Sequence, residues 1–136
     1  HVPMARTISL GRPDPRMAGL AAATDDALGA VLAEMRPGVQ TSDLAATWNR
    51  ELGRAGFHKP SRIGYSIGIA YAPDWGERTI SLRSDDATIL QRNMTFHVIG
   101  GMWLDGYGYE VSESVVVTDT GIDTFTAYPR CLTVKE

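Results

Sequence analysis

The sequence predicts an α+β domain in which two helices pack on a curved antiparallel sheet. In the first half, apolar residues recur every three or four positions, which is the helical period. The second half is richer in glycine, aromatic and β-branched residues, which is typical of strands. The 136 residues, 43% of them hydrophobic and 21% charged, are enough to bury one core but not two. We therefore expect a single domain over residues 1–136, with the helices covering one face of the sheet.

The chain opens on HVPMARTISL, which reads as the end of a strand that starts earlier. Its first residue is His1 and not Met. We therefore expect residues 1–136 to be part of a larger domain.

Two helices are predicted next. After the turn GRPDP, apolar positions fall on one helical face over residues 17–35, and Pro37 and Gly38 end that helix. A second helix is predicted over residues 41–55, where Thr-Ser-Asp is a start signal and Gly56 is placed as a C-terminal cap.

Strands are predicted at residues 95–99, 111–118 and 131–134, separated by turns rich in Asp, Asn and Gly. The stretch GYSIGIAYAPDWGERT, residues 64–79, follows neither the helical period nor a sustained strand alternation. Loops with this content of glycine and aromatic residues are typical of ligand contact. We expect this stretch to line a binding site.

Composition and charge limit the kinds of binding partner to expect. A net charge of -3 and the lack of any Lys/Arg cluster give no reason to expect nucleic acid. The single cysteine, Cys131, allows no internal disulfide and weakly favours a cytoplasmic location. No apolar run is long enough to span a membrane. A small molecule is the expected partner.

Two strand residues are candidates for chemistry. Glu113 shares a strand face with Val111 and Val115, where a carboxylate is paired, metal-bound or catalytic. His97 lies between apolar strand residues, where a lone histidine is more often a hydrogen-bonded structural residue than a catalyst. Asp74 most simply makes local turn contacts, and a pocket lined by Asp74 and Trp75 is the alternative.

The order GYSIGIAYAPDWGERT, LQRNMTFHVIGGMW, YEVSESVVVTDTGIDTFT and PRCLTV resembles the C-terminal half of the pita-bread fold of methionine aminopeptidase, prolidase, Xaa-Pro aminopeptidase and creatinase. Within that family, the stretches PDWGERT and NMTFH and the late Ser-Glu pair resemble ectoine hydrolase.

The family's peptidases bind two metal ions through two Asp, one His and two Glu. The resemblance places Tyr65, Ile99 and Pro3 in three of those positions and leaves Glu113 as the only surviving carboxylate. It therefore implies a metal-independent C–N hydrolase without a cofactor. Two divalent metals such as Mn or Co belong to the alternative, a peptidase of the Xaa-Pro type. A third interpretation is a non-catalytic binding protein on the same fold.

In the ectoine hydrolase interpretation, the substrate is a cyclic amidine, and Glu113 binds the cation or orients water. His97 shuttles protons, because it shares a strand face with Ile99. Tyr65 supplies a hydrogen bond, and Trp75 and Trp103 form an aromatic wall. The resemblance also implies a homodimer, and inactivity of residues 1–136 on their own.

Overall fold

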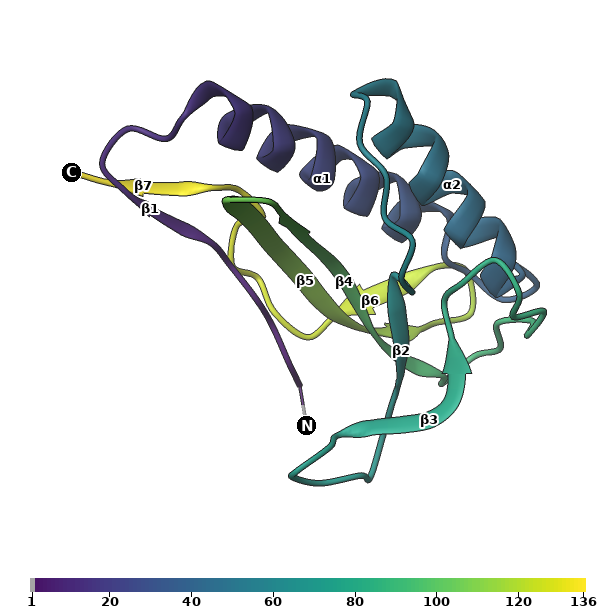
Figure 1. Cartoon of the computed structure of the whole chain (residues 1–136). Helices are drawn as coiled ribbons and strands as arrows, with labels where there is room; N and C mark the ends of the chain where they lie inside the picture. The colour runs from purple at the N-terminus through teal and green to yellow at the C-terminus, as the bar shows by residue number, and fades with distance from the viewer. Residues whose placement is uncertain (1) are drawn as a thin grey trace.

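The computed structural model describes residues 2–136. Two helices lie side by side over one face of a five-stranded antiparallel sheet with the order β3-β2-β4-β5-β6, and a separate parallel pair joins β1 and β7 (Figure 1). The elements are β1 (Ile8–Leu10), α1 (Pro15–Glu34), α2 (Thr41–Arg54), β2 (Gly64–Ile67), β3 (Gly76–Ser81), β4 (Thr95–Leu104), β5 (Tyr107–Val117), β6 (Ile122–Thr124) and β7 (Thr133–Lys135). The predicted α+β class, with helices on an antiparallel sheet, is confirmed.

Both predicted helices form, and local signals explain their ends. Pro15 occupies the first turn of α1, where its missing N–H costs nothing, and the Asp14 carboxylate accepts a hydrogen bond from the Arg16 N–H at 2.8 Å. The N-cap of α2 is Gln40, one residue before the predicted start. The Thr41 hydroxyl donates instead to the main-chain carbonyl of Asp86, at 2.6 Å.

The central feature of the sheet is the long hairpin of β4 and β5, of which the predicted strands 95–99 and 111–118 are only parts. Its strands pair without a bulge from Thr95 opposite Val116 to Leu104 opposite Tyr107. Asp105 and Gly106 make the turn, with Gly106 at φ 81°, and an Asp-Gly pair is a strong hairpin signal.

The stretch 64–79 is only partly a loop. Its ends form β2 and β3, which pair with each other, and β2 also pairs with β4. Residues 68–75 connect the two strands at the end of the sheet away from the helices (Figure 1). The expectation of an irregular segment was therefore wrong at both ends, because cross-strand pairing outweighs the weak local pattern.

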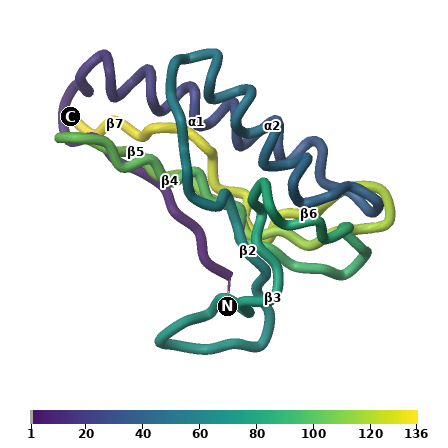
Figure 2. The backbone as a smooth tube through the Cα atoms, turned by 45° about the vertical axis from the view of Figure 1, so that its right-hand side comes forward, coloured from purple at the N-terminus to yellow at the C-terminus, as the bar shows by residue number. Residues whose placement is uncertain are grey.

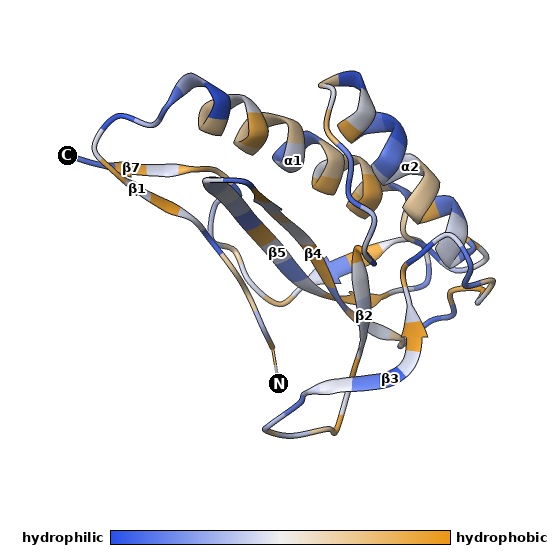
Figure 3. Ribbon diagram, viewed as in Figure 1, coloured by the Kyte–Doolittle hydropathy of each residue, from blue (hydrophilic) through white to orange (hydrophobic). Residues whose placement is uncertain are grey.

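The core lies between the helices and the sheet, and Figure 3 shows apolar helix surfaces turned toward the strands. Gly100 permits close contact there, since a Cβ would lie 2.8 Å from both Thr24 and Trp48. Over the described residues, no helix is long and apolar enough to cross a membrane.

The first residues of the described chain run along the side of the sheet away from the helices, as Figures 1 and 2 both show. The main-chain N–H of Ser112 in β5 donates to the carbonyl of Ala5 at 3.1 Å, and β1 then pairs with β7. The segment 2–7 therefore lies beside the part of β5 that β6 does not reach.

Candidate functional site

The strongest cluster of polar side chains among the predicted site residues is centred on Tyr65. The phenolic oxygen of Tyr65 lies 2.8 Å from His97 Nδ1, and Trp75 Nε1 donates to the same oxygen at 3.0 Å. Strand pairing explains the first contact, because Tyr65 of β2 lies directly opposite His97 of β4. The structure thus brings together three of the predicted residues.

His97 combines burial with an unused nitrogen. Its side chain is only 4% exposed, and Nε2 makes no hydrogen bond with any described residue. Burial lowers the pKa of His97 to about 4, so the imidazole is neutral at pH 7. A neutral imidazole has one N–H and one bare nitrogen, and the Tyr65 contact decides which is which.

Two proton arrangements are compatible with these distances. When Tyr65 donates to Nδ1, Nε2 carries the proton and is a donor. When Nδ1–H donates to the Tyr65 oxygen, Nε2 is a bare acceptor and the phenolic hydrogen is released for another partner. In both arrangements Nε2 of His97 is left without a partner among the described residues, and moving one proton between the two groups changes Nε2 from donor to acceptor.

Strand register places Glu113 on the other side of the sheet from His97. His97 is directly opposite Ser114, whereas Glu113 is directly opposite Val98, a core residue. Residues opposite each other share a face, and neighbours along a strand do not. The structure therefore does not bring His97 and Glu113 together, and a joint role at one site is not supported by their positions.

Glu113 is instead held in an ion pair. The Arg6 guanidinium contacts one carboxylate oxygen, and the Thr126 hydroxyl donates to the other at 2.7 Å. Both charged side chains are buried, with 7% and 3% of Arg6 and Glu113 exposed. This is the paired outcome among those expected for a carboxylate on an apolar strand face.

Asp74, another predicted site residue, makes no contact with His97 among the hydrogen bonds of the described residues. Asp74 is in the loop that carries Trp75, where its carboxylate accepts from the Gly76 N–H at 3.0 Å and from Arg78 Nη2 at 2.6 Å. These hydrogen bonds, the one from the Gly76 N–H first, lower the pKa of Asp74. Its contacts are those of a turn residue.

Trp103 does not join the other aromatic residues. It is six residues from His97 along β4, which corresponds to roughly 20 Å of strand. The residue is 68% exposed, and Lys59 Nζ lies 5.1 Å from its ring centroid. A single aromatic wall formed by Trp75 and Trp103 is therefore not present.

Two serines that the sequence reasoning passed over face the same side as His97. The Ser114 hydroxyl donates to the Pro3 carbonyl at 2.6 Å, and the Ser112 hydroxyl accepts from the Ala5 N–H at 2.7 Å. Ser112 lies directly opposite Ile99. The period of two in VSESV was the available signal, because it separates Ser112 and Ser114 from Glu113.

The donors on this face do not suit a pair of divalent metal ions. Tyr65, Ile99 and Ser112 offer hydroxyls or no donor at all, and Pro3 offers only a carbonyl that Ser114 already uses. Divalent ions in proteins require several carboxylate or imidazole ligands. Within residues 2–136, no three His, Cys, Asp or Glu side chains are grouped so that they could hold a metal ion.

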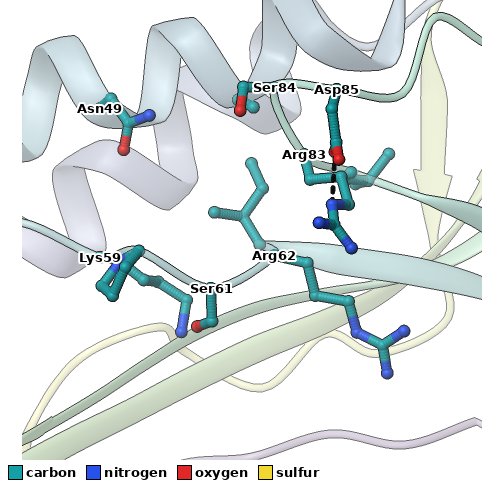
Figure 4. Close-up of a pocket in the computed structure, with 11 residues that line it drawn as sticks. Asn49, Lys59, Ser61, Arg62, Arg83, Ser84 and Asp85 are labelled. Atoms are coloured by element: carbon teal, nitrogen blue, oxygen red, sulfur yellow. Dashed lines mark ion pairs between the residues drawn. The ribbon is translucent and has the colours of Figure 1, made fainter.

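A cavity of about 360 Å³ lies elsewhere, between α2 and the segments 59–63 and 82–85 (Figure 4). Asn49 and Ser84 border one side and Lys59 and Ser61 the other. Lys59 Nζ donates to the Gly101 carbonyl at 2.5 Å, and burial lowers the pKa of this lysine. The predicted site residues do not line this cavity, and its most buried cation already has a partner.

The fold and the polar face together define an α+β protein with a histidine–tyrosine pair beside the loop 68–75. The chain belongs to the metallopeptidase family M24, whose model matches residues 1–119. The family expected from the sequence motifs is thereby confirmed.

Two curated relatives match nearly the whole chain. It is 43% identical over 136 residues to the uncharacterized hydrolase/peptidase y4tM of Sinorhizobium fredii (strain NBRC 101917 / NGR234), covering 100% of this chain and 35% of the relative. It is 42% identical over 136 residues to ectoine hydrolase of Halomonas elongata, covering 99% and 34%. The chain spans about a third of the length of these relatives.

Solved structures give the same fold. Dipeptidase PepE from Mycobacterium ulcerans superposes with a TM-score of 0.88 at 28% identity, over 96% of this chain and 35% of that one. X-Pro aminopeptidase from Thermotoga maritima superposes with a TM-score of 0.87 at 22% identity, over 97% and 37%. At the latter identity the likeness concerns the fold alone.

Proposed function

We propose that this protein is a hydrolase that cleaves a C–N bond of a small molecule without a metal ion, and that its substrate resembles that of ectoine hydrolase. The observation that carries the proposal is the buried Nε2 of His97, which has no hydrogen-bond partner within residues 2–136, while Nδ1 is held by Tyr65. The 42% identity to ectoine hydrolase and the poor fit of this face to metal ligands support it.

The chemistry follows from the two proton arrangements of the pair. With Nδ1–H donating to Tyr65, the bare Nε2 takes a proton from water, and the water oxygen forms a bond to the amidine carbon of the substrate. The resulting tetrahedral carbon loses one ring nitrogen as the C–N bond breaks, and the proton on Nε2 passes to that nitrogen. One amidine and one water become one amide and one amine.

Tyr65 acts as the positioning residue in this scheme, because it touches His97 and fixes the orientation of the ring. Its oxygen accepts from Trp75 and from Nδ1–H, so its own hydrogen is released toward the substrate. Trp75 in turn restrains Tyr65. The loop 68–75, which carries Trp75, therefore helps to hold the Tyr65–His97 pair in place.

The test combines metal content with turnover in the intact protein. Protein purified without chelator and offered Mn, Co and Zn is expected to hold far less than one metal per chain and to hydrolyse ectoine equally well after EDTA treatment. Turnover that disappears with EDTA and returns with metal would contradict the proposal.

Variants locate the chemistry. His97→Gln should lower kcat by about 100-fold or more, which is the usual range for loss of a general base. Tyr65→Phe should lower kcat less and shift the pH profile, because it removes the partner that sets the His97 proton. Tyr128 is an exposed tyrosine, at 56% of its surface, so Tyr128→Phe is the matched control and should leave turnover unchanged.

A second candidate, a dipeptidase of the Xaa-Pro type, is favoured by the likeness to dipeptidase PepE at 28% identity. It would require two divalent metals, so about two metals per chain together with cleavage of proline-containing dipeptides would favour it. The absence of turnover with either substrate class would favour the third interpretation, a non-catalytic binding protein.

A further inference from the structure

Arg62 adds a positive charge to the face that carries Tyr65 and His97. Its guanidinium carbon lies 4.5 Å from the centroid of the Tyr65 ring, which is the geometry of a cation–π contact. Within residues 2–136, Arg62 is exposed and forms no ion pair with a carboxylate. Arg62 also borders the cavity of Figure 4, where its side chain runs away from Asn49 and Ser84.

The acidic side chains near Arg62 hydrogen-bond to other groups. Asp74 is engaged by Arg78 through two hydrogen bonds, at 2.8 and 2.6 Å. Glu77 is turned toward the main chain and accepts from the Ala70 N–H at 2.7 Å. The positive charge of Arg62 also lowers the pKa of Asp74, but it is the weakest of the causes that do so. Asp74 and Glu77 therefore each hold a hydrogen bond that does not involve Arg62.

We propose that Arg62 binds a carboxylate of the substrate, so that the protein acts on a small molecule carrying an anionic group next to the bond that is cleaved. This inference rests on the proposed function, because it uses the same face of the sheet. Tyr65 is the link: the guanidinium stacks on its ring while its hydroxyl holds His97. One side chain thus sets the spacing between the charge that anchors the substrate and the nitrogen that acts on it.

The stacking also explains why Arg62 suits this role although it is exposed. A free arginine loses much side-chain entropy when it binds a ligand, and a guanidinium already held against a ring loses less. A planar guanidinium can then bind a carboxylate through two parallel hydrogen bonds. His97 Nε2, buried and without a hydrogen-bond partner among the described residues, is the polar atom of this face that a ligand group would satisfy.

The experiment measures binding as well as turnover, with ectoine and its neutral carboxamide analogue as the probes. For the unmodified protein, calorimetry should give a Kd about 10-fold lower for the carboxylate than for the carboxamide. Arg62→Gln should remove that preference, and Arg62→Lys should restore part of it, because lysine keeps the charge without the planar fork. Arg12→Gln, an exposed arginine in the turn before α1, is the matched control and should change neither Kd.

The outcomes separate the two proposals. A preference for the carboxylate that survives in Arg62→Gln, or an unmodified protein that binds both probes equally or neither, overturns the role of Arg62. If the protein hydrolyses ectoine and Arg62→Gln leaves KM unchanged, the role of Arg62 is overturned as well, but the proposed function stands. Carboxylate binding that depends on Arg62 without turnover of either probe upholds the anchor and removes the proposed hydrolysis of ectoine.

Discussion

Tyr65 is the residue at which the features of the face meet, since its ring contacts a guanidinium and an imidazole and its hydroxyl contacts an indole. The ring of His97 stands at 86° to that of Tyr65, with 5.2 Å between centroids. This edge-to-face arrangement directs Nδ1 at the hydroxyl. A phenylalanine here would keep the packing and remove the hydrogen bonds.

Burial of His97 makes stability depend on pH. The pKa falls from an ordinary 6.5 to about 4 on folding, so between these values the unfolded chain binds a proton that the folded chain does not. The free energy of unfolding should therefore be highest above pH 6.5 and should fall as the pH drops from 6.5 toward 4. The full loss is about 3 kcal/mol at most.

Denaturant unfolding at pH 7.5, 5.5 and 4.5 would measure this dependence, with His97→Gln as the comparison. The variant should show a smaller decrease over this range, because glutamine does not titrate. Identical pH dependence in both proteins would show that His97 titrates normally when folded.

At this scale the structure brings some of the predicted residues together and separates others. His97, Tyr65 and Trp75 converge, and Glu113 is paired as one of the expected outcomes. Their grouping could not be read from the sequence, because a one-residue step along β5 changes which side of the sheet a side chain faces. Arg62 was missed because its partner is a ring and not a charge.

At the scale of elements, the hairpin of β4 and β5 decides where the polar residues lie. Its unbroken register assigns Ser112 and Ser114 to one face and Glu113 to the other. The strands are longer than the sequence indicated, since glycines at positions 100, 101 and 108 weaken the local strand pattern. Both predicted helices were easier to recognise, because 3.6-residue periodicity persists over many turns.

Two glycine substitutions test this account of the elements. Gly106→Ala should destabilise the protein by about 1 kcal/mol, because φ is 81° in the hairpin turn and alanine is strained there. Gly29→Ala in α1 should stabilise it by roughly 0.5–1 kcal/mol, since a Cβ at that position meets nothing within 4 Å.

Chemical denaturation of the two variants in parallel gives both values, and each serves as the control for the other. The prediction fails if both substitutions shift stability in the same direction. Neither glycine touches Tyr65 or His97, so binding of the carboxylate probe should be unaffected in both.

At the scale of the whole molecule, Arg6 and Glu113 join parts of the chain that are 107 residues apart. Arg6 also donates to the main-chain carbonyls of Ser112, Tyr128 and Pro129, at 2.6, 2.8 and 2.7 Å. One guanidinium therefore connects the segment 2–7, β5 and the segment that leads to β7.

Removing one member of this pair should be costly. Glu113→Leu leaves a buried cation without its partner and should destabilise the protein by about 3–5 kcal/mol. The double variant Arg6→Met with Glu113→Leu should lose clearly less than the sum of the two single changes, because the uncompensated charge disappears. Thermal or urea unfolding would measure the coupling, and strict additivity would contradict it.

The position of the segment 2–7 has a consequence for association between molecules. β6 pairs only with Val115, Val116 and Val117, so the earlier part of β5 would be a bare sheet edge without this segment. The Ser112 N–H donates to the Ala5 carbonyl. The Thr7 hydroxyl accepts from the N–H of Glu110 and donates to the Glu110 carbonyl. These groups would otherwise be open to a strand of another chain. Residues 2–7 thus cover a sheet edge that could otherwise pair with another molecule. A truncated chain that lacks them should aggregate and precipitate under conditions in which its helices are still folded.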